Sequence, residues 1–212
     1  MLRYQSFVVN FVQEVSYLIW DETGIACLID PGFSSPKEAE QLRKVLQDDG
    51  LRLVRSIATH RHFDHLLGIE LIAKDYGILT EVPEQDLREM PGLTSQLRAF
   101  GVPMGSEEEQ PYEKPLQLDG ADYIKVGEEE LQVLHTPGHT PGHVIFYSKG
   151  SGLLFTGDLL FRNGFGRYDL WGGNYTDLMH SLTEVAFKLP NETIVLPGHG
   201  PKTTIGEEKC NF

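Results

Sequence analysis

Four side chains that can bind a metal ion lie within six residues of one another, in the segment THRHFDH at residues 59–65. They are His60, His62, Asp64 and His65, and they follow an apolar run. A single histidine in such a place is usually structural, but this density of nitrogen and oxygen donors is typical of a metal centre. Alternate side chains of an extended backbone point the same way, so His60 and His62 can reach one ion while Asp64 and His65 reach another.

Further ligands must come from elsewhere, because a metal ion takes three or more protein groups and a catalytic ion keeps one position open for water. Three turns that contain glycine and adjoin apolar runs supply them: TPGH with His139, TGD with Asp158 and PGH with His199. A glycine beside a ligand lets the backbone turn tightly and approach the ion. The predicted metal ligands are therefore His60, His62, Asp64, His65, His139, Asp158 and His199.

The elements that must position these ligands are predicted from apolar periodicity and turn signals. Strands are expected at RYQSFVV, VSYLIW, IACLID and LVRSIATH, and later near YIKVG, LQVLHT, HVIFYS, LLFTGD and TIVLPG. One helix is expected from about Pro36 to Gln47 with Ser35 as its N-cap, and another over HLLGIELIAKDYG up to Gly77. A third is expected over about 176–189. The predicted ligands then lie in loops at strand ends.

Two mixed sheets packed face to face, with helices outside, would bury strands of this kind and expose the polar faces of the helices. The predicted fold class is α/β, a four-layer αββα sandwich of two mixed β-sheets flanked by helices, formed by residues 1–212 as one domain. Residues 83–115 interrupt the alternation with an amphipathic stretch in which Leu93, Leu97, Phe100 and Met104 can share a face. This stretch is either a helix packed on the body or a flap or dimer contact over the site.

The charge balance argues against a nucleic-acid partner, because a net charge of -13 repels phosphate backbones. No apolar run is long enough to cross a membrane, and the opening residues carry Asn10, Gln13 and Glu14 where a signal peptide would be apolar. A cytoplasmic protein is expected. Cys27 is interpreted as a buried core residue and Cys210 as a tail residue, without a disulfide.

The whole ligand pattern, a THxHxDH loop followed by a histidine, an aspartate and a last histidine, resembles the metallo-β-lactamase superfamily. The resemblance implies two divalent ions, with zinc expected and iron or manganese as alternatives. One would be bound by His60, His62 and His139, the other by Asp64, His65 and His199, with Asp158 bridging them. The β-lactamases proper commonly have cysteine in place of Asp158 and lack His65, so antibiotic hydrolysis is not favoured.

Within the superfamily, the stretches TPGHTPGHVIFY, TGDLLFRNGFGRYDLWGG and PGHGPKTTIG resemble compact enzymes related to glyoxalase II, the hydroxyacylglutathione hydrolases. This resemblance implies hydrolysis of a small-molecule thioester, such as S-lactoylglutathione, by a water molecule that the metals activate. Asp64 is then expected to be catalytic as well, by accepting a proton. We interpret His143 as structural, and Asp30 as a carboxylate that holds the histidine loop by hydrogen bonds.

The match weakens where glyoxalase II enzymes bind their thiol carrier. The positions of a lysine and two tyrosines in those enzymes are filled here by Arg167, Asp169 and Pro201. We expect Arg167 to bind a carboxylate of the substrate, because guanidinium matches that geometry. The alternative is a surface pair of Arg167 with Asp169.

Three rival functions remain. A persulfide dioxygenase, which uses one iron and oxygen, resembles this chain in length and in its GRxD segment. A two-metal phosphodiesterase or nuclease would use the same ligands, but the acidic charge argues against it. A binding module with a vestigial site is disfavoured, because all the ligand positions of the family pattern are filled.

Overall fold

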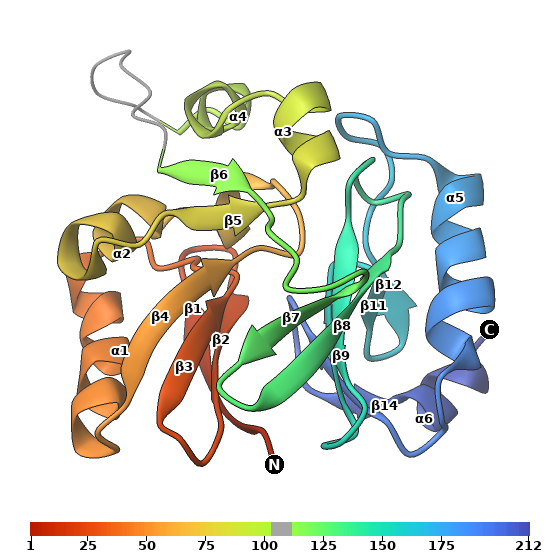
Figure 1. The fold of residues 1–212 in the computed structure, drawn as a ribbon. Helices are drawn as coiled ribbons and strands as arrows, with labels where there is room; N and C mark the ends of the chain where they lie inside the picture. Colours follow the sequence, from red (N-terminus) through yellow and green to blue (C-terminus); the bar gives the residue numbers. More distant parts are fainter. Residues whose placement is uncertain (103–111) are drawn as a thin grey trace.

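The computed structural model describes residues 1–102 and 112–212, whose strands form two mixed sheets packed face to face (Figure 1). The strands of the first sheet, in spatial order, are β1 (Arg3–Val9), β2 (Glu14–Trp20), β3 (Ile25–Ile29), β4 (Arg52–Ile57), β5 (Thr80–Val82) and β6 (Glu113–Pro115). The second sheet has the order β14 (Thr203–Thr204), β13 (Ile194–Pro197), β10 (Leu153–Gly157), β9 (Val144–Ser148), β8 (Glu129–His135) and β7 (Tyr123–Val126). A small hairpin, β11 (Leu160–Phe161) with β12 (Gly164–Phe165), follows β10.

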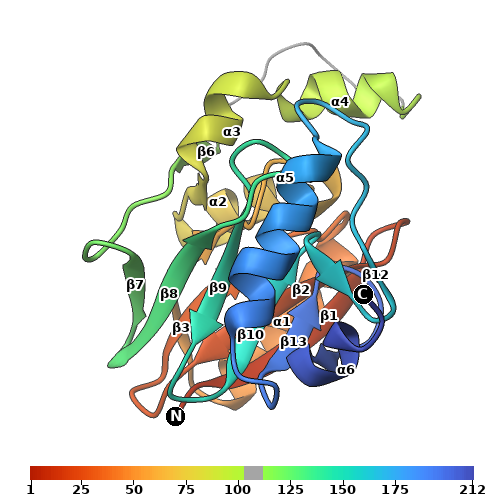
Figure 2. The same ribbon diagram turned by 90° about the vertical axis from the view of Figure 1, so that its right-hand side faces the viewer.

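Helices cover the outer faces of both sheets. α1 (Pro36–Asp48) and α2 (Ile69–Tyr76) pack on the first sheet, and α5 (Tyr175–His180) and α6 (Ile205–Lys209) pack on the second. α3 (Glu84–Glu89) and α4 (Leu93–Ala99) lie at one end of the sandwich (Figure 2). Figure 1 shows α1 and α2 beside the first sheet and α5 on the far side of the second, and Figure 2 shows α5 lying across the second sheet. The predicted four-layer αββα sandwich is therefore confirmed.

Alternation along the strands separates the layers. In β2, Tyr17 and Ile19 pack in the space between the two sheets. Leu18, which separates them in the sequence, faces the opposite side, towards the layer that holds α1. Phe146 and Phe155 of the second sheet meet the first pair in the same buried cluster. This period of two is what an extended chain requires when each face of a sheet is covered.

The helix predictions hold at the start and change towards the end of the chain. α1 begins after Ser35, whose side chain accepts a hydrogen bond from the Glu38 amide, and α2 ends at Gly77 in the left-handed region at φ 70°. The helix predicted over 176–189 is found over 175–188, but only its first part, α5, is α-helical: a π turn at Ser181–Val185 and a 3-10 turn at Ala186–Lys188 continue it. In a regular α-helix, with about 3.6 residues per turn, apolar residues spaced four apart move gradually around the helix axis. A π turn holds more residues per turn and reduces that movement.

The described residues of the 83–115 segment form α3, α4 and the edge strand β6. Leu97 is buried, whereas Phe100 is 44% exposed. Met104 of the predicted apolar face lies outside the described residues. Cys27 is buried and Cys210 exposed, both without a disulfide, and the described part of the chain contains no helix long and apolar enough to span a membrane.

Candidate metal centre

The predicted ligands follow the carboxyl ends of strands that run in the same direction within each sheet. β10 is parallel to β13, and both β8 and β10 are antiparallel to β9, so β8, β10 and β13 end at one edge. His139, Asp158 and His199 lie just beyond these three ends. The loop after β4, with His60 and His62, meets them from the first sheet, and the 3-10 turn η1 (Phe63–His65) completes that loop.

Three buried imidazoles form the first group of donors. His60 Nε2 lies 3.2 Å from His139 Nε2, and His62 Nδ1 lies 2.7 Å from the same atom. The donor atoms of His60, His62 and His139 all lie within 4.8 Å of one another. This is a three-histidine set of the kind that binds zinc or iron.

Asp64, His65 and His199 form the second group of donors. Asp64 Oδ2 lies 3.2 Å from His199 Nε2 and 3.8 Å from His65 Nε2. Asp158 stands between the groups: its Oδ1 is 3.3 Å from His65 Nε2 and its Oδ2 is 3.4 Å from His139 Nε2. One carboxylate thus directs an oxygen at each group, which is the geometry that a bridging ligand requires.

The donors fit a pair of cations better than they fit one another. His65 Nε2 and Asp158 Oδ1 are buried without a hydrogen-bond partner among the described residues. Leaving such atoms unpaired is costly, and a cation between them would satisfy both. The buried His/Asp groups are therefore consistent with a binuclear metal site.

The electrostatics of the two groups differ. Burial, with the neighbouring imidazoles, lowers the pKa of His60 well below its usual value, and burial with His139 beside it lowers the pKa of His62 to about 3. These imidazoles are neutral, which is the form that binds metal. Burial also lowers the pKa of His65, but the carboxylates of Asp158 and Asp30 outweigh it and raise that pKa well above its usual value. The second group of donors therefore favours a positive charge.

Asp30 connects the two groups from behind. Its Oδ1 accepts a hydrogen bond from the Thr59 amide at 2.7 Å, and its Oδ2 accepts one from the Thr59 hydroxyl at 2.9 Å. That hydroxyl lies 2.9 Å from His60 Nδ1, and Asp30 Oδ2 itself lies 3.1 Å from His65 Nδ1. Asp30 thus holds the histidine loop through Thr59, as predicted, and it also contacts the back of one histidine of the second group.

His139 and His143 are oriented by their own loops. The Nδ1 of His139 lies 2.6 Å from the carbonyl oxygen of Arg167, which leaves Nε2 for the metal site. His143 places Nδ1 2.9 Å from the Thr136 hydroxyl and accepts a 3.3 Å hydrogen bond from the Asp158 amide at Nε2. His143 therefore has the structural contacts predicted for it.

Three buried polar residues near the ligands were missed by sequence reasoning. Glu14 at the start of β2 is buried, and its Oε1 lies 3.8 Å from His65 Nδ1. Asp86 of α3 and Gln96 of α4 are also buried. No motif marks these residues: Glu14 directly precedes the predicted strand VSYLIW, and Asp86 and Gln96 lie in the stretch 83–115 that interrupts the predicted alternation.

Asp86 and Gln96 fasten the helices α3 and α4 to the loops of the first group. Asp86 accepts hydrogen bonds from the Arg61 amide at 3.0 Å, from Thr140 Oγ1 at 2.8 Å and from the Gly142 amide at 2.6 Å. Gln96 accepts from the Phe63 amide at 3.0 Å and donates to the Arg61 carbonyl at 2.7 Å, on either side of His62.

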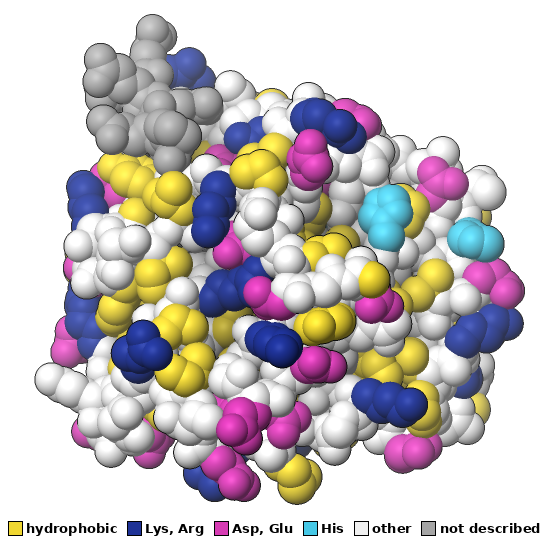
Figure 3. All heavy atoms as spheres, in the orientation of Figure 1, with side chains coloured by type: hydrophobic (Ala, Val, Ile, Leu, Met, Phe, Trp, Pro, Cys, Tyr) yellow, Lys and Arg dark blue, Asp and Glu magenta, His cyan; other side chains and the backbone are white. Residues whose placement is uncertain are grey.

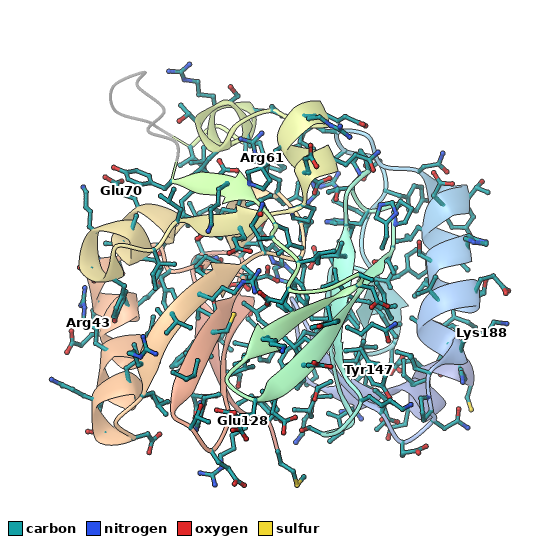
Figure 4. All side chains as sticks on the ribbon, viewed as in Figure 1. Arg43, Arg61, Glu70, Glu128, Tyr147 and Lys188 are labelled. Atoms are coloured by element: carbon teal, nitrogen blue, oxygen red, sulfur yellow. The ribbon has the colours of Figure 1, made fainter. Side chains whose placement is uncertain are left out.

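The side chain of Arg61 adds to these connections. It pairs with Glu113 of β6 at 2.7 Å and donates to the Met90 carbonyl at 3.0 Å. Figure 4 labels Arg61 at this place. Residues 83–102 are therefore an integral support of the first group.

Two glycines lie where a side chain would strike the site. At Gly157, with φ 46°, a Cβ would come within 2.3 Å of Thr59 Oγ1. At Gly198 it would lie 2.6 Å from Asp158 Oδ1 and 2.7 Å from His65 Cε1. The predicted need for close backbone approach is therefore met at both turns.

Arg167 is paired in this structure. Its Nε and Nη2 donate to the Asp169 carboxylate at 2.7 and 2.9 Å, with both side chains largely exposed. This is the surface pair that the sequence left as the alternative. A substrate contact by Arg167 stays a prediction, and it would require exchange of Asp169 for a substrate carboxylate.

Comparison with known proteins agrees with this geometry. The family model described as "Metallo-beta-lactamase superfamily" matches residues 9–199. "Hydroxyacylglutathione hydrolase GloC" of Haemophilus influenzae is 34% identical, over 95% of this chain and 92% of that protein. "Probable metallo-hydrolase YqgX" of Bacillus subtilis is 32% identical, over 98% and 95% respectively.

Two solved structures resemble the fold over nearly their whole length. That of "BLEG-1 B3 metallo-beta-lactamase" has a TM-score of 0.84 at 31% identity, covering 98% of this chain and 97% of that one. That of "TTHA1623 in a di-iron-bound form" has a TM-score of 0.80 at 36% identity, covering 97% and 96%. With the family match and the converging donors, the chain belongs to the metallo-beta-lactamase superfamily and is one of its metal-dependent hydrolases.

Proposed function

We propose that this protein hydrolyses a small-molecule thioester of the hydroxyacyl class, such as S-lactoylglutathione. The observation that carries the proposal is the position of Asp158, whose two carboxylate oxygens face two separate donor groups. Such an arrangement suits two ions side by side. The similarity to the Haemophilus influenzae hydroxyacylglutathione hydrolase supports a thioester as the substrate.

Two divalent ions held there would lower the pKa of a water molecule towards neutrality and stabilise the negative charge that develops on the carbonyl oxygen. Asp64 is the residue we assign to proton transfer. Its Oδ2 lies at the second donor group, 3.2 Å from His199 Nε2, and its side chain is only partly covered. A carboxylate in this position can take a proton from the attacking water and pass it to the leaving thiol.

We propose zinc as the natural metal pair, with iron and manganese as alternatives, because nitrogen and oxygen donors accept all three. The di-iron form of TTHA1623 is a reason to test iron on equal terms. A nucleic-acid substrate is not proposed. On the face drawn in Figure 3, lysine and arginine side chains are scattered among acidic ones, and the chain as a whole carries a net charge of -13.

The test is a substrate panel on protein loaded separately with zinc, iron(II) or manganese. The panel contains S-lactoylglutathione and simpler hydroxyacyl and acyl thioesters, with release of free thiol as the readout. Turnover of a thioester by the metal-loaded wild type supports the assignment of the reaction, and its loss in Asp64→Asn, compared at equal metal content per chain, supports Asp64 as the proton acceptor. A metal-loaded protein that cleaves no thioester overturns it.

A β-lactam is the comparison substrate, because BLEG-1, named a B3 metallo-beta-lactamase, resembles this chain over nearly its whole length, although Asp158 and His65 do not favour antibiotic hydrolysis. A chromogenic β-lactam therefore belongs in the same panel, together with a phosphodiester reporter. An oxygen electrode with a glutathione persulfide tests the dioxygenase alternative. Oxygen uptake by protein with one iron per chain would replace the hydrolase assignment.

A further inference from the structure

Four aromatic side chains from separate segments form a continuous surface, here called the aromatic ridge: Phe11, Phe63, Phe100 and Trp171. Phe11 stacks on Phe63 with ring centroids 6.1 Å apart, and Phe63 lies 5.0 Å from Phe100. Phe100 lies 6.0 Å from Trp171. The ring of Trp171 is in turn 6.0 Å from the imidazole of His62, so the ridge ends at a predicted ligand of the first ion.

The aromatic ridge is exposed to solvent, where the surface of a protein is normally polar. Phe11 is 63% exposed and Phe100 is 44% exposed, and Val12 beside Phe11 is exposed as well. Phe63 beneath them is buried and forms the base. Single exposed apolar residues are ordinary, but a contiguous aromatic group next to a site marks a binding surface.

The loop that presents Phe11 is fixed relative to the metal ligands. Asn10 and Gln13 adopt positive φ angles of 50° and 60°, which non-glycine residues rarely do. Asn10 Nδ2 donates to the carbonyl oxygens of Asp64 at 2.9 Å and Gly32 at 3.0 Å, and its Oδ1 accepts from the Val12 amide at 3.1 Å. The position of Phe11 is thereby tied to the backbone of Asp64.

The charges beside the ridge do not favour an anionic ligand. The guanidinium groups of Arg61 and Arg167, which belong to the loops of His62 and Trp171, are both paired with carboxylates, those of Glu113 and Asp169. Rigid aromatic rings bind flat apolar groups with little loss of side-chain entropy. The ridge therefore suits an apolar group that extends from the metal centre.

We propose that the aromatic ridge is a binding subsite for the acyl substituent of the substrate, and that it selects flat apolar substituents, aryl groups above all. The proposal rests on the proposed function only in identifying this group as part of a thioester. The ridge itself binds the apolar group of any molecule whose polar end reaches the metal centre.

The first test uses two metal-binding probes on zinc-loaded protein, acetohydroxamate and phenylacetohydroxamate, with affinities measured by calorimetry. The phenyl probe should bind about tenfold or more tightly than the methyl probe, as expected for a buried aromatic contact. Trp171→Ala and Phe100→Ala should remove most of this preference, read as the ratio of the two probe affinities in each variant. Tyr168→Ala is the matched control, because Tyr168 is an exposed aromatic of the same loop that packs on Tyr175, at 5.0 Å, rather than on the ridge.

Equal affinity of the two probes for the wild-type protein would overturn the subsite, whether or not the variants fold. So would a Tyr168→Ala variant that loses the preference as fully as Trp171→Ala. Sedimentation of the wild-type protein and of Phe11→Ser completes the test. A dimer that forms at working concentration and is lost in the variant would assign the ridge to a second copy of the chain instead.

A parallel measurement separates this proposal from the proposed function. The kcat/KM values for acetyl and phenylacetyl thioesters of the same thiol are compared in wild type and Trp171→Ala. If no thioester is cleaved but the hydroxamates are still discriminated, the thioesterase assignment fails and the subsite stands. If thioesters are cleaved without preference and the hydroxamates bind equally, the reverse holds.

Discussion

Replacing Asp30 by asparagine should weaken the binding of both metal ions together. Asparagine has nearly the same shape and tolerates the positive φ of 52° at this position. It removes the negative charge that accepts two hydrogen bonds from Thr59 and lies 3.1 Å from His65 Nδ1. Because Thr59 contacts His60 of the first group and His65 belongs to the second, one substitution perturbs a ligand of each ion.

The expected size follows from the role of the carboxylate. Loss of a group that orients a ligand from behind weakens metal binding about 10–100-fold, which corresponds to about 1.4–2.7 kcal/mol for each ion. The assay is competition of zinc-loaded protein with a chromophoric chelator, together with elemental analysis after dialysis. Both dissociation steps should move to weaker affinity.

Asp21→Asn is the matched control. Asp21 is also buried and accepts hydrogen bonds from the Thr23 amide at 3.0 Å, from the Thr23 hydroxyl and from the Glu128 amide at 2.7 Å. It lies in the turn between β2 and β3, at the end of the sheet away from the metal ligands. Asp30→Asn that retains both ions with wild-type affinity, or Asp21→Asn that loses them equally, would refute the reasoning.

Three further outcomes follow from the same contacts. Gln96→Met should weaken binding of the first ion about tenfold and spare the second, because Gln96 hydrogen-bonds to the backbone on either side of His62 and otherwise to the Pro91 carbonyl; equal loss of both ions in the chelator titration would contradict this. Gly198→Ala should lower activity at least tenfold, since its Cβ would lie 2.6 Å from Asp158 Oδ1, whereas Gly150→Ala, whose nearest neighbour is 3.7 Å away, should be silent. Removal of both ions by chelation should lower the thermal midpoint, by an amount that grows with the ratio of metal concentration to Kd; a midpoint that chelator leaves unchanged would count against buried ions.

The ligand groups could be predicted because their signals are local. Each ligand adjoins a glycine turn or a dense histidine segment at the end of an apolar strand, and strand ends at one edge bring such loops together. The two sheets and the first helix were predictable for the same reason. The apolar alternation of the strands and the helix start at Ser35-Pro36 can both be recognised in short stretches of the sequence.

What could not be predicted depends on distant segments meeting. Asp86 and Gln96 stand in short helices without a motif, and only the fold shows that they reach the backbone beside His62. The aromatic ridge joins the β1–β2 loop to Trp171, more than half the chain apart, and no pattern marks that contact. The strands β5 and β6 are too short, at three residues each, to show a period of their own.

The most direct test of the central claim is the metal content of the protein after loading with zinc and gel filtration, measured by elemental analysis against protein concentration. We predict two ions per chain, falling to one or fewer in Asp158→Ala because the carboxylate that faces both donor groups is gone. A wild-type protein that retains no zinc, or an Asp158→Ala variant that still holds two ions at wild-type affinity, would contradict the account.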